Sequence, residues 1–161
     1  MNKRRLEAVA KKLDALPRER FDYGQWVDHS WKGNPDLPCG ASACALGWAT
    51  TIPALRKAGL RLSRKREPIL GAFYAYVHIV GHRKTRNECG QLDKLLTSIN
   101  AAAKIFDISV PEAAYLFIPA SVYRNRPAAN ASAKRVAKHI REFIKRGGIP
   151  NAMKEELENA L

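Results

Sequence analysis

The stretch KRVAKHIREFIKRGG, residues 134–148, carries apolar and basic side chains on two opposite faces of a helix. The apolar face consists of Val136, Ala137, Ile140, Phe143 and Ile144. The other face has basic residues at i, i+4, i+7 and i+11, which are Lys134, Lys138, Arg141 and Lys145. Two glycines follow, and glycine commonly ends a helix. The stretch therefore predicts an amphipathic helix that buries one face and exposes a row of positive charge.

Other segments have the same helical spacing. Residues 6–16 are apolar at intervals of three and four, between Asn2, a good N-cap, and Pro17, which cannot continue a helix. Residues 92–106 predict another helix, and Pro111 at a first-turn position predicts one that runs through Phe117. The small residues of segment 38–49 predict a tightly packed helix that ends at Pro53. A short acidic helix is expected at 151–161.

These patterns predict an all-α fold, a mostly helical single domain over residues 1–161 with a short acidic C-terminal part, 147–161. Aromatic and β-branched residues at 69–80 leave two structures open, a helix or a short strand around 74–80. The chain has 161 residues, of which 46% are hydrophobic and 27% charged, the usage of an ordinary globular domain. A packed core is expected.

The sequence favours a cytoplasmic location. The first five residues are charged and run into an amphipathic pattern, which is unlike a secretory signal. The longest nearly uninterrupted apolar run, residues 69–81, is shorter than the roughly 20 residues that span a bilayer, so no membrane contact is expected. The three cysteines are an odd number, which indicates reduced thiols rather than a disulfide framework.

The net charge of +13 is concentrated in two blocks. Residues 56–86 contain nine Lys and Arg against one Glu, and residues 121–146 contain eight against one. Clustered positive charge is typical of a surface that neutralises phosphates. We therefore expect a non-catalytic protein that binds DNA or RNA. The expected phosphate contacts are Arg64, Lys65, Arg66, Arg83, Lys84, Arg86, Arg124, Arg126, Lys134, Lys138, Arg141 and Lys145.

A helix-turn-helix is the first alternative, over residues 102–116. A recognition helix presents polar side chains to base edges. The second helix here offers mostly apolar side chains and the single acidic Glu112. We therefore expect a buried helical corner rather than a DNA-reading motif.

The cysteines suggest two further alternatives. Cys39 lies near an expected helix N-terminus, which favours a thiolate, so a cysteine hydrolase with His29, His78 or His82 as base is conceivable, although no spacing selects among them. A zinc site would combine cysteines and histidines from three segments, Cys39, Cys44, His78, His82 and Cys89. The Cys-x4-Cys spacing lies at the edge of what structural zinc sites use. Neither a catalytic residue nor a metal or cofactor is expected.

Two stretches carry a family resemblance. The sequences CGASACALGWA (39–49) and FDISVPEAAYLF (106–117) resemble small uncharacterised proteins of bacteriophages and their hosts, which share C-G-T-x-x-C-x-A-G-W-A and F-G-L-S-x-x-E-A-x-x-L-F elements. Here Ala41 or Ser42 stands near the family's threonine, Leu46 replaces an alanine and Asp107 replaces a glycine. The resemblance implies a phage setting in a bacterial host cell and no particular activity. It adds a competing function, a counter-defence inhibitor that binds a host immune protein or a complex that handles nucleic acid.

Overall fold

The computed structural model describes residues 1–23, 41–66, 73–81, 94–118, 130–150 and 153, with 64–66, 73–75 and 94–96 described in their backbone only. Within these ranges the chain is mostly helical, as expected, but it also contains a sheet. The helices are α1 (Lys3–Asp14), α2 (Ala45–Ala49), α3 (Pro53–Lys57), α4 (Lys94–Phe106), α5 (Val110–Phe117) and α6 (Ala133–Arg146). A 3-10 turn, η1 (Arg18–Arg20), follows α1, and the strands are β1 (Leu60–Arg66) and β2 (Phe73–Ile79).

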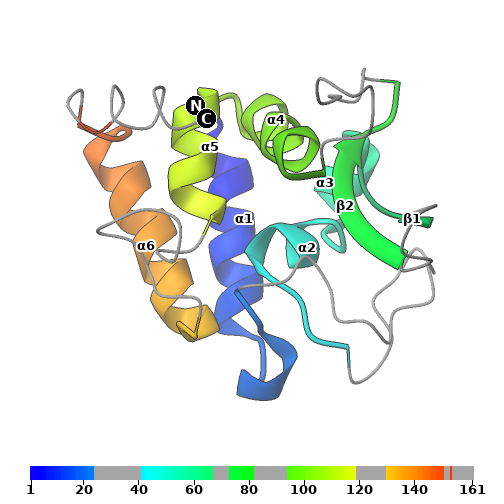
Figure 1. Cartoon of the computed structure of the whole chain (residues 1–161). Helices are drawn as coiled ribbons and strands as arrows, with labels where there is room; N and C mark the ends of the chain where they lie inside the picture. Colours follow the sequence, from blue (N-terminus) through cyan, green and yellow to red (C-terminus); the bar gives the residue numbers. More distant parts are fainter. Residues whose placement is uncertain (24–40, 67–72, 82–93, 119–129, 151–152, 154–161) are drawn as a thin grey trace.

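Helix α1 lies in the middle of the molecule and contacts α2, α4 and α6 (Figure 1). Its predicted start is confirmed, because Asn2 Oδ1 accepts a hydrogen bond from the backbone N–H of Arg5 at 3.1 Å. The buried side chains recur at helical spacing and are Leu6, Val9, Ala10 and Leu13. The N-terminal helix is thus the element around which the other helices pack.

Helix α6 packs along α1 and runs in the opposite direction (Figure 1). Ser132 caps its start by accepting a hydrogen bond from the backbone N–H of Arg135 at 3.3 Å. Its end is the predicted one, since Gly147 adopts a left-handed φ of 83° and donates to the carbonyls of Phe143 and Ile144. The buried residues include Val136, Ala137, Ile140 and Phe143, so the apolar face expected from the sequence is confirmed.

Helices α4 and α5 form the predicted pair, joined by a turn in which Asp107 has a φ of 53°. A capping box opens α5, because Ser109 and Glu112 exchange side-chain and backbone hydrogen bonds. Almost the whole of α5 is buried, from Pro111 to Phe117 apart from half-buried Glu112. The second helix is therefore the expected buried corner, and its side chains are not available to read base edges.

The expectation of one helix ending at Pro53 is wrong. Within residues 41–53, α2 ends at Ala49, where the hydroxyls of Thr50 and Thr51 donate to the carbonyls of Gly47 and Trp48 at 2.6 and 2.8 Å. Pro53 instead begins α3, a position at which its missing N–H is not needed. Residues 38–40 lie outside the described part of the chain.

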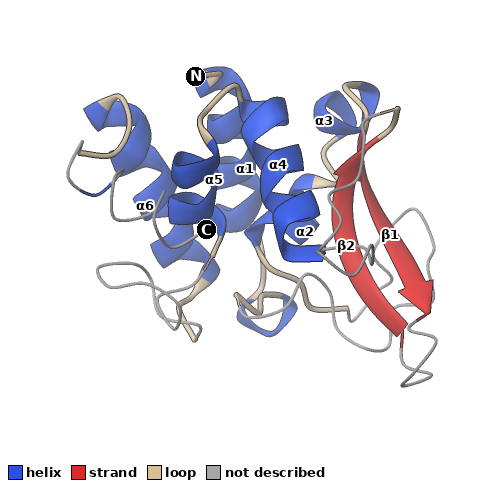
Figure 2. Ribbon diagram, turned by 45° about the horizontal axis from the view of Figure 1, so that its top comes forward, coloured by secondary structure: helices blue, strands red, loops and turns tan. Residues whose placement is uncertain are grey.

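Strands β1 and β2 pair antiparallel, from Leu60 opposite Ile79 to Arg66 opposite Phe73. The alternative of a short strand around 74–80 is confirmed, and a helix is wrong for the described part of 69–80, residues 73–80. Val77 and Ile79 are buried in the core, and the backbone N–H of Val77 donates to Ser98 Oγ of α4 at 3.0 Å, so α4 lies along the edge of β2 that β1 leaves open. Figure 2 shows the sheet on the side of the molecule away from α6.

The core joins all these elements in one apolar cluster. It includes Leu6 of α1, Leu46 of α2, Phe106 of α4, Phe117 of α5 and Ile140 of α6. The rings of Phe106 and Phe117 stack with centroids 5.3 Å apart. None of the helices among the described residues is long and apolar enough to cross a membrane. The acidic helix expected at 151–161 falls outside the described residues, except for Met153.

Candidate nucleic-acid interface

Four of the predicted phosphate contacts have described side chains, and all four lie on α6. Lys134, Lys138 and Lys145 are exposed, and Arg141 is half-buried. The backbones of residues 64–66 lie in β1, but their side chains are outside the description. The remaining predicted contacts, Arg83, Lys84, Arg86, Arg124 and Arg126, also lie outside the described residues.

Arg141 differs from the three lysines because it is bound by carboxylates of α1. Its Nε donates to Glu7 Oε1 at 3.1 Å, and its Nη2 donates to Asp14 Oδ2 at 2.5 Å. The hydrogen bond to Asp14, followed by the one to Glu7, raises the pKa of Arg141 above its ordinary value. Arg141 is therefore a link between the two helices, and its charge is largely balanced within the protein.

The Arg141 link defines which sides of α1 and α6 meet. Residues three, four and seven positions apart share one side of a helix, so Lys134, Lys138 and Lys145 lie on the same side of α6 as Arg141. By the same spacing Lys3, Arg4 and Lys11 lie on the side of α1 that carries Glu7 and Asp14. All three are exposed. We call the six residues Lys3, Arg4, Lys11, Lys134, Lys138 and Lys145 the α1–α6 basic face.

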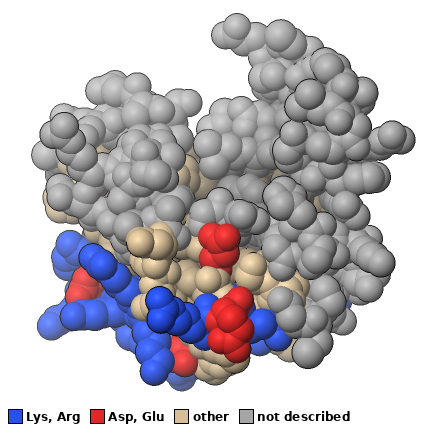
Figure 3. Space-filling model, turned by 60° about the horizontal axis from the view of Figure 1, so that its bottom comes forward, with Lys and Arg blue, Asp and Glu red and all other residues tan. Residues whose placement is uncertain are grey.

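The residues of α1 were missed from the sequence, although a signal was present. Residues 1–20 contain seven Lys and Arg against three Asp and Glu, and Lys3 and Lys11 are spaced two helical turns apart. In Figure 3, Lys and Arg side chains gather along one side of the described surface, with Asp and Glu between them. The interface is thus a mixed surface with an excess of positive charge.

Several other basic side chains are used inside the fold. Arg5 donates to the carbonyl of Ile105 at 2.8 Å, and Arg61 donates to that of Arg56. Lys12 Nζ and the Arg20 guanidinium lie over the ring of Trp48, 5.3 and 4.9 Å from its centroid. By contrast, among the described residues of the α1–α6 basic face, only Lys138 is within ion-pair distance of a carboxylate, 3.9 Å from Glu142.

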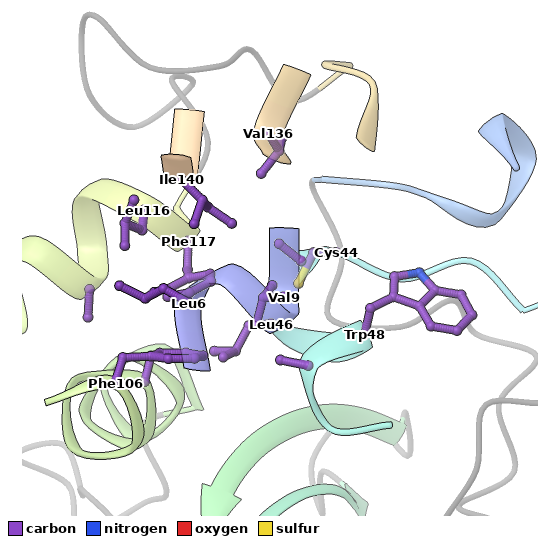
Figure 4. Packing of buried hydrophobic residues seen from close by; sticks show 14 of the residues in the cluster. Leu6, Val9, Cys44, Leu46, Trp48, Phe106, Leu116, Phe117, Val136 and Ile140 are labelled. Atoms are coloured by element: carbon purple, nitrogen blue, oxygen red, sulfur yellow. The ribbon is translucent and has the colours of Figure 1, made fainter. Parts of the chain in front are cut away.

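Cys44 is a core residue rather than a reactive thiol. It is only 2% exposed, lies in the apolar cluster (Figure 4), and caps α2 by accepting a hydrogen bond from the backbone N–H of Gly47 at 3.4 Å. Burial raises its pKa to about 12, against hydrogen bonds from the backbone that lower it. A thiol with this pKa is protonated at neutral pH, so Cys44 supplies no nucleophile.

The rest of the hydrolase and zinc alternatives cannot be assembled from the described residues. Cys39, Cys89, His29 and His82 lie outside them. His78, on β2, shares a hydrogen bond between its Nε2 and Ser63 Oγ at 2.7 Å. In the part of the chain that the structure describes, no three His, Cys, Asp or Glu side chains are grouped to hold a metal ion.

No protein-family model, curated protein or solved structure matches this chain. The resemblance to phage proteins therefore stays a prediction.

Proposed function

We propose that this protein binds nucleic acid through phosphate contacts along the α1–α6 basic face and carries out no reaction on it. The observation that supports the proposal is the link of Arg141 to Glu7 and Asp14. It brings the exposed lysines of α1 and α6 to one surface and offsets one of the two negative charges between them. Exposed Lys and Arg side chains on one surface can replace the counterions of a phosphate backbone together.

The dimensions of the face suit a backbone track. Lys134 and Lys145 are eleven residues apart, which is about 16 Å along a helix. That distance is the axial length of about five phosphates of one strand. With Arg141 included, the surface carries seven basic residues and three acidic ones, Glu7, Asp14 and Glu142, so positive charge is in excess. Such contacts position a strand without selecting its sequence.

Titration of fluorescently labelled oligonucleotides at about 50 mM salt tests the proposal. The wild-type protein binds, and the triple variant Lys134→Gln, Lys138→Gln, Lys145→Gln binds at least tenfold more weakly. The double variant Lys134→Gln, Lys138→Gln also binds more weakly, whereas its matched control, Lys57→Gln with Lys104→Gln, exposed lysines on α3 and α4, retains most of the affinity. Absence of binding by the wild-type protein, or equal losses in the two variants, overturns the proposal.

A further inference from the structure

A pocket of about 540 Å³ is lined by residues of η1 and by the residues just before α6, at one end of the α1–α6 basic face. Its lining residues come from three separate segments of the chain: Arg18, Glu19, Phe21, Asp22, Ser42, Asn130 and Ala131. The last two directly precede Ser132, the N-cap of α6. The exposed side chains of Lys134 and Arg135 follow within the first turn of that helix. The pocket and the proposed phosphate track are therefore adjacent.

The wall formed by η1 and residues 41–43 is held in place by hydrogen bonds. Phe21 and Ala43 form a parallel bridge, in which the N–H of Asp22 donates to the Ala43 carbonyl at 3.2 Å. Arg20 Nε donates to the Ala41 carbonyl at 2.6 Å, and Trp48 Nε1 donates to the Arg20 carbonyl at 2.8 Å. This wall of the pocket is thus in place before any ligand enters, as is usual for ligand sites.

The lining combines groups that suit a planar, polar ligand. Phe21 is half-buried and offers an aromatic ring, which is itself stacked on Tyr23 with centroids 6.0 Å apart. Glu19 supplies an exposed carboxylate acceptor, and Asn130 supplies an amide. Arg18 is exposed and adds a guanidinium for a phosphate. The volume is within the range of pockets that hold ligands of drug or nucleotide size.

We propose that this pocket takes one unpaired base of a single-stranded nucleic acid, with guanine preferred. This inference rests on the proposed function, because the α1–α6 basic face holds the adjoining phosphates. The base stacks on Phe21, and a carboxylate accepts hydrogen bonds from the N1–H and the amino group of guanine. Bases of a duplex are paired on that edge and are not available to such a pocket. The expected partner is therefore a single strand rather than a double helix.

The pocket is tested by itself with free nucleotides. Saturation-transfer NMR on the intact protein with GMP, AMP, CMP and UMP at millimolar concentration is expected to give the strongest signal for GMP. Phe21→Leu keeps an apolar side chain and removes the ring, so it is expected to lose the GMP signal while the protein stays folded by circular dichroism. A signal that is equal for all four nucleotides, or that survives in folded Phe21→Leu, overturns the base pocket.

Oligonucleotides then separate this inference from the proposed function. Anisotropy titrations compare a dT10 strand carrying one central guanine, its RNA counterpart, the dT10 strand and a duplex; the first two distinguish DNA from RNA. Phe21→Leu is expected to weaken guanine-strand binding about tenfold and leave duplex binding unchanged. Glu19→Gln is expected to abolish the preference for the guanine strand, and Asp107→Asn, at the α4–α5 turn, is the control for the lost charge.

The outcomes differ for the two proposals. If single strand and duplex bind equally in the wild type, or if Phe21→Leu weakens both alike, the base pocket is wrong and the phosphate track stands. If no oligonucleotide binds at low salt but GMP does, the phosphate track is wrong and the pocket is a mononucleotide site. If Glu19→Gln loses the guanine preference and Asp107→Asn keeps it, the result supports the pocket as proposed.

Discussion

Arg141 Nη2 on α6 lies 2.5 Å from Asp14 Oδ2 on α1, two residues that are 127 positions apart in the sequence. The contact ties the first helix to the last long one in the region where their polar sides meet. It places acidic residues of α1 against a basic residue of α6, and it leaves the neighbouring lysines exposed. The proposed phosphate-binding surface therefore depends on a contact that also belongs to the fold.

The Arg141–Asp14 contact is expected to contribute modestly to stability. Arg141 is 39% exposed and Asp14 41%, so solvent screens the pair, and the coupling measured by a double-mutant cycle of Arg141→Gln and Asp14→Asn should be about 0.5–1 kcal/mol. Chemical unfolding of the wild type, the two single variants and the double variant gives the coupling energy. This energy should be smaller in 1 M salt. Lys145→Gln is the matched control and should leave the free energy of unfolding nearly unchanged. A coupling of zero at low salt would show that the two helices are not joined here.

Cys44 makes stability depend on pH in the alkaline range. Its folded pKa of about 12 lies above the ordinary 9.0, so its contribution is complete below pH 9 and is lost as pH rises toward 12. Between pH 9 and 10.5 the free energy of unfolding should fall by roughly 1 kcal/mol per pH unit more in the wild type than in Cys44→Ser. Identical pH profiles for the two proteins would contradict the burial of this thiol.

The same residue is expected to resist alkylation. At pH 8 iodoacetamide should leave Cys44 unmodified in the folded protein and modify it after unfolding in urea, as peptide mass mapping can show. Rapid modification in the folded state would mean that the thiol is accessible and that α2 does not pack as described.

Gly147 is needed for the end of α6. Its φ of 83° is left-handed, and a Cβ there would meet nothing within 4 Å, so the cost of Gly147→Ala comes from backbone strain alone. We expect the free energy of unfolding to fall by about 1 kcal/mol in Gly147→Ala. The fall should be smaller in Gly147→Asn, because asparagine tolerates this conformation better. Thermal unfolding of the two variants measures the difference. If the Gly147→Ala variant is as stable as the wild type, α6 does not end in the left-handed cap.

Most helices could be predicted because their signals are local. Asn2 and Gly147 mark helix ends by their own chemistry, and the apolar spacing of α6 gives its buried face directly. Pro53 was misjudged because proline both ends and begins helices, and the hydroxyls of Thr50 and Thr51 decide between the two. The strand β1 was missed because its run of basic residues has no clear apolar alternation, and it is defined by pairing with β2.

The candidate site was predictable only in part, for a related reason. The exposed lysines of α6 follow from helical spacing, and Lys134, Lys138 and Lys145 lie on the surface as expected. Sequence spacing does not reveal that Arg141 meets Glu7 and Asp14, since that contact depends on how α1 and α6 pack. The pocket beside η1 was also hidden, because its residues come from three segments that only the fold brings together.

If α1 and α6 act as one phosphate-binding surface, as we propose, removing basic residues from either helix changes the salt dependence of nucleic-acid binding. The slope of log affinity against log salt concentration should be reduced by about one for each phosphate-contacting lysine removed. Lys3→Gln with Lys11→Gln on α1 should reduce it by about two, as should Lys134→Gln with Lys138→Gln on α6, and the four changes together by about four. If the α1 pair leaves the slope at the wild-type value while the α6 pair reduces it, the two helices do not share a nucleic-acid surface.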